Sequence, residues 1–286
     1  MNLIGLMLAR NEEWIIGASA RAAMQWCDSL IVYAHDCTDR TADLAYIAGG
    51  TVYAVGDRSG VWNEMDLRQE MLGIGREKGG THFAIVDADE ILTDNLSSSI
   101  REYIGALDPG ELLDLPMIPA WRAIDMQRVD SCVWTRSWLT TAFRDRPDLG
   151  WAARDGYHFH ARPPRNSIRG SHTRPVTGRS VGGVIHAQWA DWPRLVAKQT
   201  LYKMIERLRW PDRESAARVN AKYDEAMDET GLLIEQIPSR WIHPRLMSFV
   251  DTGIKPWQES EIQRLIDAHG LDVFNGIDLK HFARQV

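Results

Sequence analysis

Three carboxylates follow an apolar run in residues 82–90, which read His-Phe-Ala-Ile-Val-Asp-Ala-Asp-Glu. The acids are Asp87, Asp89 and Glu90. Two acidic side chains one residue apart repel each other unless a positive group lies between them. Oxygen ligands suit Mg²⁺ or Mn²⁺, which in proteins typically also hold a phosphate. The pattern therefore indicates a metal and diphosphate site, although an isolated Asp-x-Asp more often marks a solvated turn.

The apolar run before these acids has the pattern of a buried parallel strand, because a strand covered on both faces is continuously apolar. Ligands of open α/β sheets bind at the carboxyl ends of such strands. The same arrangement occurs twice earlier in the chain. The run Leu3–Ala9 ends in Arg10-Asn11-Glu12-Glu13, and the run Ser29–Ala34 ends in the polar residues 35–41. Three polar clusters after three successive strands favour a binding site over isolated turns.

Helical signals separate these strands. Asn11 is a candidate cap for a helix carrying Trp14, and Thr41 opens a helix that Gly49-Gly50 ends. A third helix is expected from about Val61 to Lys78, before Gly79-Gly80. Strands alternating with helices predict an α/β fold with a doubly wound, mainly parallel sheet flanked by helices.

Residues 1–95 resemble the nucleotide-binding half of a family 2 glycosyltransferase with the GT-A fold, of the bacterial or phage type that acts on lipopolysaccharide cores. The matching elements are Arg10-Asn11-Glu12, the segment 36–41 (Asp-Cys-Thr-Asp-Arg-Thr, where the family often reads D-G-S-T-D-G-T), Arg68, and Asp87-Ala88-Asp89-Glu90 as the family's D-x-D. Their order and spacing together carry the resemblance, which fades after Asn95.

The resemblance implies a donor-binding set and a metal-binding set. Asp36 would accept a hydrogen bond from the nucleobase, most often uracil, and Arg68 would hold base or ribose. The implied donor-binding residues are Asn11, Glu12, Asp36, Asp39, Arg68 and Asp87, and the implied ligands of Mn²⁺ or Mg²⁺ are Asp87, Asp89 and His186. The alternatives are structural: Asp36 and Asp39 have the residue type of turn and cap positions, and Arg68 that of a solvated helix surface.

His186 ends a short apolar strand that begins after Gly182-Gly183. A helix follows, with Asp191 as its expected N-cap and Pro193 in its first turn. In many GT-A enzymes a late histidine completes the metal's coordination, and imidazole is a competent ligand for Mn²⁺. A structural histidine is the alternative. Lys198, Tyr202 and Lys203 follow on the helix, where one of them could reach a phosphate.

Residues 121–180 are strongly basic, although the whole chain has a net charge of −6. This segment holds eleven arginines, five aspartates and no lysine or glutamate. Arginine suits bidentate contacts to phosphate or carboxylate, so the segment is a candidate for holding a diphosphate or an anionic acceptor. Alternatively, the arginines pair with acidic residues or cover aromatic surface.

An inverting transfer needs a carboxylate or histidine that deprotonates the acceptor hydroxyl. The candidates are Asp155, His158, His160 and, less favoured, Asp130. We assign the catalytic role to Asp155 and His160 and favour Asp155 as the base. In the related lipopolysaccharide enzymes a glutamate follows the histidine, whereas Ala161 follows His160 here.

Composition sets broad limits. The chain has 286 residues, of which 44% are hydrophobic, and its three scattered cysteines predict reduced thiols in a cytoplasmic protein. No apolar stretch approaches the ~18 residues of a membrane span. We expect a GT-A domain over residues 1–190, with a nucleotide-binding half (1–95) and an acceptor half (96–190). The expected helical C-terminal region, 191–286, contains amphipathic helices over Asp212–Met227, Ile237–Val250 and Trp257–His269.

The sequence as a whole predicts a metal-dependent, inverting, hexosyltransferase-like enzyme. It would move a sugar from a nucleotide diphosphate donor, a UDP-sugar above all, to an acceptor hydroxyl on a glycan or lipid-linked sugar. A nucleic-acid acceptor and the oligomeric state stay open. One alternative is a non-catalytic nucleotide-sugar or carbohydrate-binding protein. A sugar-phosphate nucleotidyltransferase is less favoured, because it would need a glycine-rich basic loop where Arg10-Asn11-Glu12-Glu13 stands.

Overall fold

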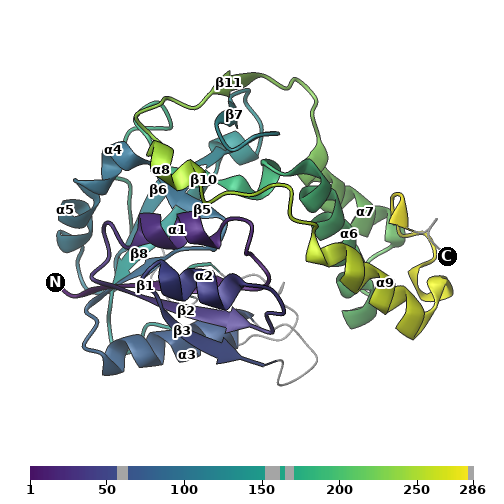
Figure 1. Ribbon diagram of the computed structural model, residues 1–286, viewed down its shortest axis with the longest axis horizontal. Coiled ribbons are helices and arrows are strands. Elements are labelled where there is room, and N and C mark those ends of the chain that lie inside the picture. Colours follow the sequence, from purple (N-terminus) through teal and green to yellow (C-terminus); the bar gives the residue numbers. More distant parts are fainter. Residues whose placement is uncertain (57–63, 152–161, 165–170, 283–286) are drawn as a thin grey trace.

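The computed structural model describes residues 1–56, 64–151, 162–164 and 171–282 (Figure 1). Asp155, His158 and His160 lie outside the described residues. The expected alternation of strands and helices is confirmed in the first part of the chain. Its elements are β1 (Leu3–Ala9), α1 (Ile16–Ala23), β2 (Ser29–His35), α2 (Thr41–Ile47), β3 (Thr51–Val55), α3 (Glu64–Glu77) and β4 (His82–Ile85).

A nine-stranded sheet forms the centre of the protein, and its strand order is β3-β2-β1-β4-β8-β6-β10-β5, with β9 paired to β6. Strands β1 to β4 are parallel, whereas β8 runs antiparallel to both β4 and β6. Strand β10 is parallel to β6 and therefore points the same way as β4. The later strands are β5 (Glu90–Leu92), β6 (Leu112–Pro119), β8 (Trp138–Arg144), β9 (His172–Thr173) and β10 (Val184–His186).

Both faces of the sheet are buried, which explains the continuous apolar runs. Alternate residues of β1 belong to two different cores, with Leu3 and Met7 on one side and Ile4 and Leu6 on the other. Helices α1, α2, α4 (Asp94–Ser97) and α5 (Ile100–Gly105) contribute to the first core, and α3 contributes to the second (Figure 1). Full burial of a Leu or Ile side chain stabilises the fold by about 1.5–3 kcal/mol. The α/β fold with a mainly parallel sheet between helices is confirmed.

The C-terminal third contains α6 (Trp192–Arg209), α7 (Ala216–Asp224) and α9 (Trp257–His269), which pack around a core of their own at the right of Figure 1. This core includes Leu201, Met204, Val219, Ile262 and Leu265. The predicted bounds of α9 are confirmed, and so is the Asp191 cap, which accepts from the Arg194 amide at 3.1 Å.

Two helices expected in this third differ from the structure. The helix over Ile237–Val250 is wrong: only α8 (Pro244–Met247) is helical there, because prolines at 238 and 244 lack the amide hydrogen that a helix interior needs. The helix over Asp212–Met227 is shorter, since Ser215 caps α7 by accepting from the Arg218 amide at 3.3 Å.

The C-terminal region also returns to the first part of the chain. Strand β11 (Ile234–Gln236) pairs antiparallel with β7 (Met126–Arg128), and Leu246 of α8 packs in one core with Trp14. The division of the chain at residue 190 stays a prediction. No helix in the described part is both long and apolar enough to span a membrane.

The Asn11 cap is wrong. Helix α1 begins at Ile16, and Asn11 has a positive φ of 53°. Its side-chain Oδ1 accepts from the Thr38 amide at 2.8 Å, so it holds the loop after β2 instead of a helix end. Asparagine tolerates this left-handed conformation better than most residues.

Candidate functional site

A cavity of about 580 Å³ lies at the carboxyl ends of β1, β4 and β10, with side chains of α6 and α9 in its wall. This volume is typical of a small-molecule site. The sheet order places β2 and β4 on opposite sides of β1, so the cavity lies at a topological switch point, where α/β sheets bind ligands. The charged and amide-bearing residues of its wall are Arg10, Glu12, Glu64, Arg68, Asp87, Asp89, Arg162, His186, Gln188, Lys198, Gln199, Lys222 and Gln258, and the indole of Trp257 also lines it.

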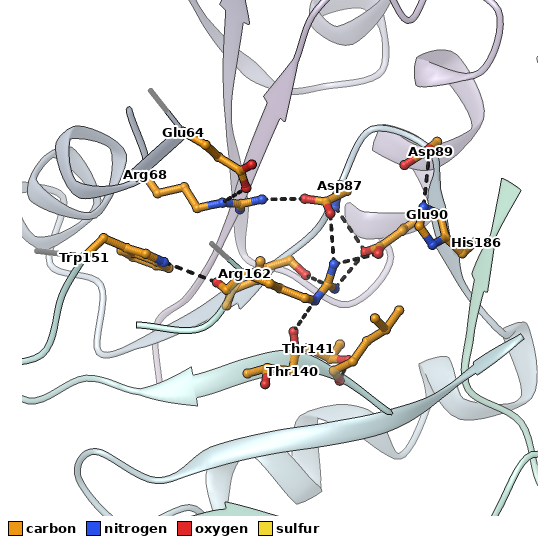
Figure 2. A network of polar contacts seen from close by, with 12 residues as sticks. Glu64, Arg68, Asp87, Asp89, Glu90, Thr140, Thr141, Trp151, Arg162 and His186 are labelled. Carbon is orange, nitrogen blue, oxygen red and sulfur yellow. Dashed lines mark hydrogen bonds and ion pairs between the residues drawn. The ribbon is translucent and has the colours of Figure 1, made fainter. Parts of the chain in front are cut away.

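Asp87 is held between two arginines (Figure 2). Arg68 Nη2 lies 2.7 Å from Asp87 Oδ1, and Arg162 Nη1 lies 3.0 Å from Oδ2. Arg68 is itself fixed by Glu64 of the same helix, with Nε 2.7 Å from Oε1. Burial alone would raise the pKa of Asp87, but the two guanidinium groups outweigh it and lower the pKa. Asp87 is therefore a carboxylate at neutral pH.

Glu90 lies beneath Asp87 and binds Arg162 with both oxygens. The Nη1–Oε1 and Nη2–Oε2 distances are 2.6 and 2.8 Å, and the Glu90 side chain is 2% exposed. Arg162 also donates to the backbone carbonyls of Ile85 and Thr140, at 3.2 and 2.7 Å (Figure 2). Every nitrogen of the Arg162 guanidinium group thus donates a hydrogen bond, and the side chain links the end of β4 to β8.

Asp89 faces two cationic or ionisable groups. Its Oδ2 lies 3.4 Å from His186 Nε2 and 3.5 Å from Lys198 Nζ. Burial alone would raise the pKa of Asp89, but Lys198 and His186 hold it well below its usual range. Conversely, burial disfavours a charged His186, yet the Asp89 carboxylate outweighs it and raises the pKa of the imidazole.

Strand pairing explains how His186 reaches this position. It pairs with Glu90 across the antiparallel β10–β5 ladder. The approach of β10 to β6 depends on Gly183, because a Cβ there would lie 2.1 Å from the carbonyl oxygen of Pro116. The predicted short strand ending in His186 is confirmed.

Asp89 and His186 fit a divalent metal ion. Two neighbouring ligands of an octahedral ion at ~2.1 Å are about 3 Å apart, close to the 3.4 Å between Asp89 Oδ2 and His186 Nε2. Asp87 would have to release an arginine to join them. No group of three metal-ligating side chains occurs among the described residues, so phosphate and water oxygens would complete the coordination, as is common for Mg²⁺.

The other predicted donor-binding residues divide into two groups. Glu12 and Arg68 line the cavity with Asp87, whereas Asn11, Asp36 and Asp39 are not part of its wall. Asp36 forms an ion pair with Arg10 at 3.0 Å, from a backbone with a φ of 48°. Asp39 accepts from the Thr41 amide at 2.9 Å, at the start of α2. Their roles in donor binding stay predictions.

Most described arginines of residues 121–180 have structural partners. Arg128 forms an ion pair with Asp130 at 2.7 Å, so Asp130, the less favoured candidate for the catalytic base, already has a cationic partner. Arg122 lies over the Trp192 ring at 3.5 Å and binds Glu229 at 2.8 Å. In the cavity wall this segment supplies a single arginine, Arg162, within the part that the structure describes. The alternative that the arginines pair with acids and cover aromatic surface therefore describes most of them.

Another part of the cavity wall is apolar and aromatic. The indole nitrogens of Trp134 and Trp189 donate to the carbonyls of Glu225 and Ala226, at 3.3 and 2.8 Å, which fixes both rings. Their ring centroids are 5.2 Å apart. The apolar and aromatic residues on this side are Met117, Trp134, Trp138, Leu139, Trp189, Leu201, Ile205, Tyr223 and Ala226. Such a wall suits the apolar face of a ring.

Five buried polar atoms of residues in the cavity wall have no hydrogen-bond partner among the residues that the structure describes. They are Arg10 Nε, Arg68 Nη1, His186 Nδ1, Trp257 Nε1 and Gln258 Oε1. An unpartnered buried polar group costs about 1–3 kcal/mol. Three of the five are obligate donors, which acceptor oxygens of a ligand would satisfy. Trp257 and Gln258 were missed by sequence reasoning, since nothing in the periodicity of α9 links them to residues 10–12.

Glu12 has an unusual protonation equilibrium. Burial and the nearby Asp89 carboxylate raise its pKa to about 7, although Lys198 and Arg194 oppose them. Trp14 Nε1 donates to Glu12 Oε2 at 2.6 Å. A group with a raised folded-state pKa stabilises the fold below its unfolded pKa, and this contribution is lost as pH rises through the folded value.

We therefore expect the effect of Glu12→Gln on the free energy of unfolding to depend on pH. The variant should gain stability over the parent between pH 4.5 and pH 8, by on the order of 2 kcal/mol. Glutamine keeps the Trp14 contact and does not ionise. Urea unfolding with a chelator present measures the effect. The exposed Glu235→Gln is the control, expected to change stability by less than ~0.5 kcal/mol. An equal effect of Glu12→Gln at both pH values would contradict the raised pKa.

Neither a protein-family model nor a curated protein matches the sequence. Among solved structures, glucosyl-3-phosphoglycerate synthase from Mycobacterium tuberculosis, in complex with Mg²⁺ and UDP, is 19% identical with a TM-score of 0.32. The match covers 41% of this chain and 43% of the synthase chain, so the chain spans less than half of that protein. TarS from S. aureus is 11% identical with a TM-score of 0.39, over 94% of this chain and 54% of that one. Similarity at this level identifies neither a substrate nor a reaction for this chain.

Proposed function

We propose that this protein is a metal-dependent glycosyltransferase that moves a sugar from a UDP-sugar to an acceptor hydroxyl. The observation that carries the proposal is the cavity at the switch point, where Asp87 and Asp89 meet Arg68, His186 and Lys198 and where buried donors lack partners. The motif resemblance of residues 1–95 supports the same reaction. The two acids of the D-x-D, Asp87 and Asp89, line one cavity with Arg68.

Several residues of the cavity wall would stabilise the departing diphosphate, each in a different way. Asp89 and His186 would hold Mg²⁺ or Mn²⁺, which when bound neutralises charge on the diphosphate. Lys198 lies beside the same Asp89 oxygen and can donate to a phosphate oxygen. The unpartnered Nη1 of Arg68 offers a further donor. Fixed donors aimed at developing charge are the main source of catalysis in such sites.

The acceptor would occupy the aromatic side of the cavity, between Trp134, Trp138 and Trp189. A sugar ring has an apolar face that packs on indole and hydroxyls at its rim, so we propose a glycan or lipid-linked sugar as acceptor. Asp155 or His160 would deprotonate its hydroxyl in an inverting, hexosyl-type transfer. Both assignments stay predictions, as does the cytoplasmic location.

A nucleotide screen tests this function. UDP with Mn²⁺ at about 100 times its dissociation constant is expected to raise the melting temperature by about 5 °C, because it binds only the folded state. ADP, GDP and dTDP, and UDP with a chelator, are expected to give smaller shifts. Slow release of UDP from UDP-glucose or UDP-galactose would support catalysis. Binding without UDP release would favour the non-catalytic alternative, and no nucleotide response would contradict the proposal.

A further inference from the structure

The first turn of α9 contributes two adjacent polar side chains to the cavity wall, Trp257 and Gln258. Gln258 is 3% exposed, and its Oε1 has no hydrogen-bond partner within the described parts of the chain. The same holds for the indole Nε1 of Trp257. Buried polar side-chain atoms are satisfied in the large majority of cases, so two exceptions on adjacent residues need an explanation.

A ligand in the cavity is one source of such partners. Both atoms are buried, while their residues line the cavity, so each side chain must turn to bring its polar atom to a ligand there. The terminal sp³–sp² torsion of Gln258 is broad and soft, so its amide can change direction at little cost. The two residues offer complementary chemistry: the amide oxygen accepts, and the indole N–H donates.

Their position identifies the end of the cavity that they serve. The Arg10 guanidinium lies over the Trp257 ring, 4.7 Å from its centroid, and Arg10 Nη2 contacts Asp36 Oδ2 at 3.0 Å. This end therefore lies at the carboxyl ends of β1 and β2. The metal and diphosphate residues Asp87 and Asp89 follow β4, which is two strands, or about 10 Å, from β2.

We propose that Gln258 and Trp257 recognise the nucleobase of the bound nucleotide. This inference rests on the proposed function, which places a diphosphate at the β4 end and hence a nucleoside at the other. A base edge with an N–H beside a carbonyl, as in uracil, can donate to Gln258 Oε1 and accept from Trp257 Nε1. Asp36 then acts as a positioning residue, because it holds Arg10 against the Trp257 ring and lies outside the cavity wall.

Calorimetric titration of the full chain tests the inference, with UDP, ADP, UDP-glucose and inorganic pyrophosphate as ligands and Mg²⁺ present. Gln258→Leu removes the amide at similar size, and Trp257→Phe removes the indole N–H but keeps a ring under Arg10. Each variant is expected to lose about 10-fold in UDP affinity and most of its preference for UDP over ADP. Pyrophosphate affinity is expected to stay within about 2-fold of the parent, and this also shows that the variants are folded.

Matched controls come from the same region. Gln263→Leu changes a glutamine of α9 outside the cavity wall, where it binds Asp267 at 2.8 Å. Trp210→Phe changes a tryptophan that is likewise absent from the wall. Both are expected to keep the affinity and base preference of the parent.

Three results would overturn the inference while leaving the proposed function intact. They are an unchanged preference for UDP over ADP in both variants, an equal loss of UDP and pyrophosphate affinity, and a loss confined to UDP-glucose, which would assign the pair to the donor sugar. Failure of the parent protein to bind any nucleotide would instead overturn the proposed function, and the inference with it.

Discussion

Replacing Arg162 with alanine is expected to lower the free energy of unfolding by about 3–5 kcal/mol, the usual cost of removing one partner of a buried ion pair. Arg162 is the common cation for Asp87 and Glu90, at 3.0 and 2.6 Å. Its loss leaves Glu90, which is 2% exposed, without its bidentate partner. It also leaves the carbonyls of Ile85 and Thr140 without their side-chain donor.

Urea unfolding followed by tryptophan fluorescence measures this effect. Arg162→Lys keeps the charge but cannot reproduce the bidentate contact, so we expect an intermediate loss. The control is Arg264→Ala, which removes an exposed pair with Glu261 on α9 and is expected to cost less than about 0.5 kcal/mol. A loss below ~1 kcal/mol for Arg162→Ala would show that Glu90 takes up a proton or water at little cost.

The sheet and the position of the acids could be predicted because both depend on local sequence. A strand buried on two faces is apolar along its length, and Asp87 and Asp89 follow such a strand directly. The bounds of α9 and the Asp191 cap follow from local pattern in the same way. These features need no knowledge of which distant segments meet.

The partners of the acids could not be predicted. Arg162 is one of eleven arginines in its segment, and only the folded chain brings it to Glu90, 72 residues earlier. Gln258 reaches the cavity because α9 packs against α6, which no periodicity encodes. The family resemblance implies base recognition by Asp36, and this role stays a prediction; in the structure Asp36 binds Arg10 and lies outside the cavity wall. Local sequence therefore predicts the residues at the strand ends, but not the side chains from distant segments that contact them.

The acids at residues 87–90 were expected to repel one another unless a positive group lies between them. The protein itself provides such groups, since Arg68 and Arg162 hold Asp87 while His186 and Lys198 face Asp89. Removing the charge of Asp89 relieves its repulsion with Glu12 but also removes the partner of two positive groups. It leaves Lys198 beside a neutral group, and we expect Asp89→Asn to cost about 1–3 kcal/mol of stability near pH 7. Because the pKa of Asp89 is lowered on folding, its stabilising effect is present above the unfolded pKa and is lost as pH falls through the folded value.

Asp89→Asn is expected to have its largest effect on ligand binding, with a loss of about 100-fold or more in Mg²⁺-dependent affinity for UDP. Asparagine keeps the shape of the side chain but supplies no charge to a divalent ion, and His186 alone is a poor site for Mg²⁺, which prefers oxygen. Calorimetric titration of UDP with Mg²⁺ and with chelator separates the metal-dependent part. Asp114→Asn is the matched control, because Asp114 is also a buried acid beside a histidine, His172 at 2.9 Å, but is not in the cavity wall. It is expected to lose stability and keep the Mg²⁺-dependent affinity of the parent. Equal UDP affinity in Asp89→Asn and the parent, with the metal effect retained, would place the metal away from Asp89 and remove the basis for the proposed site.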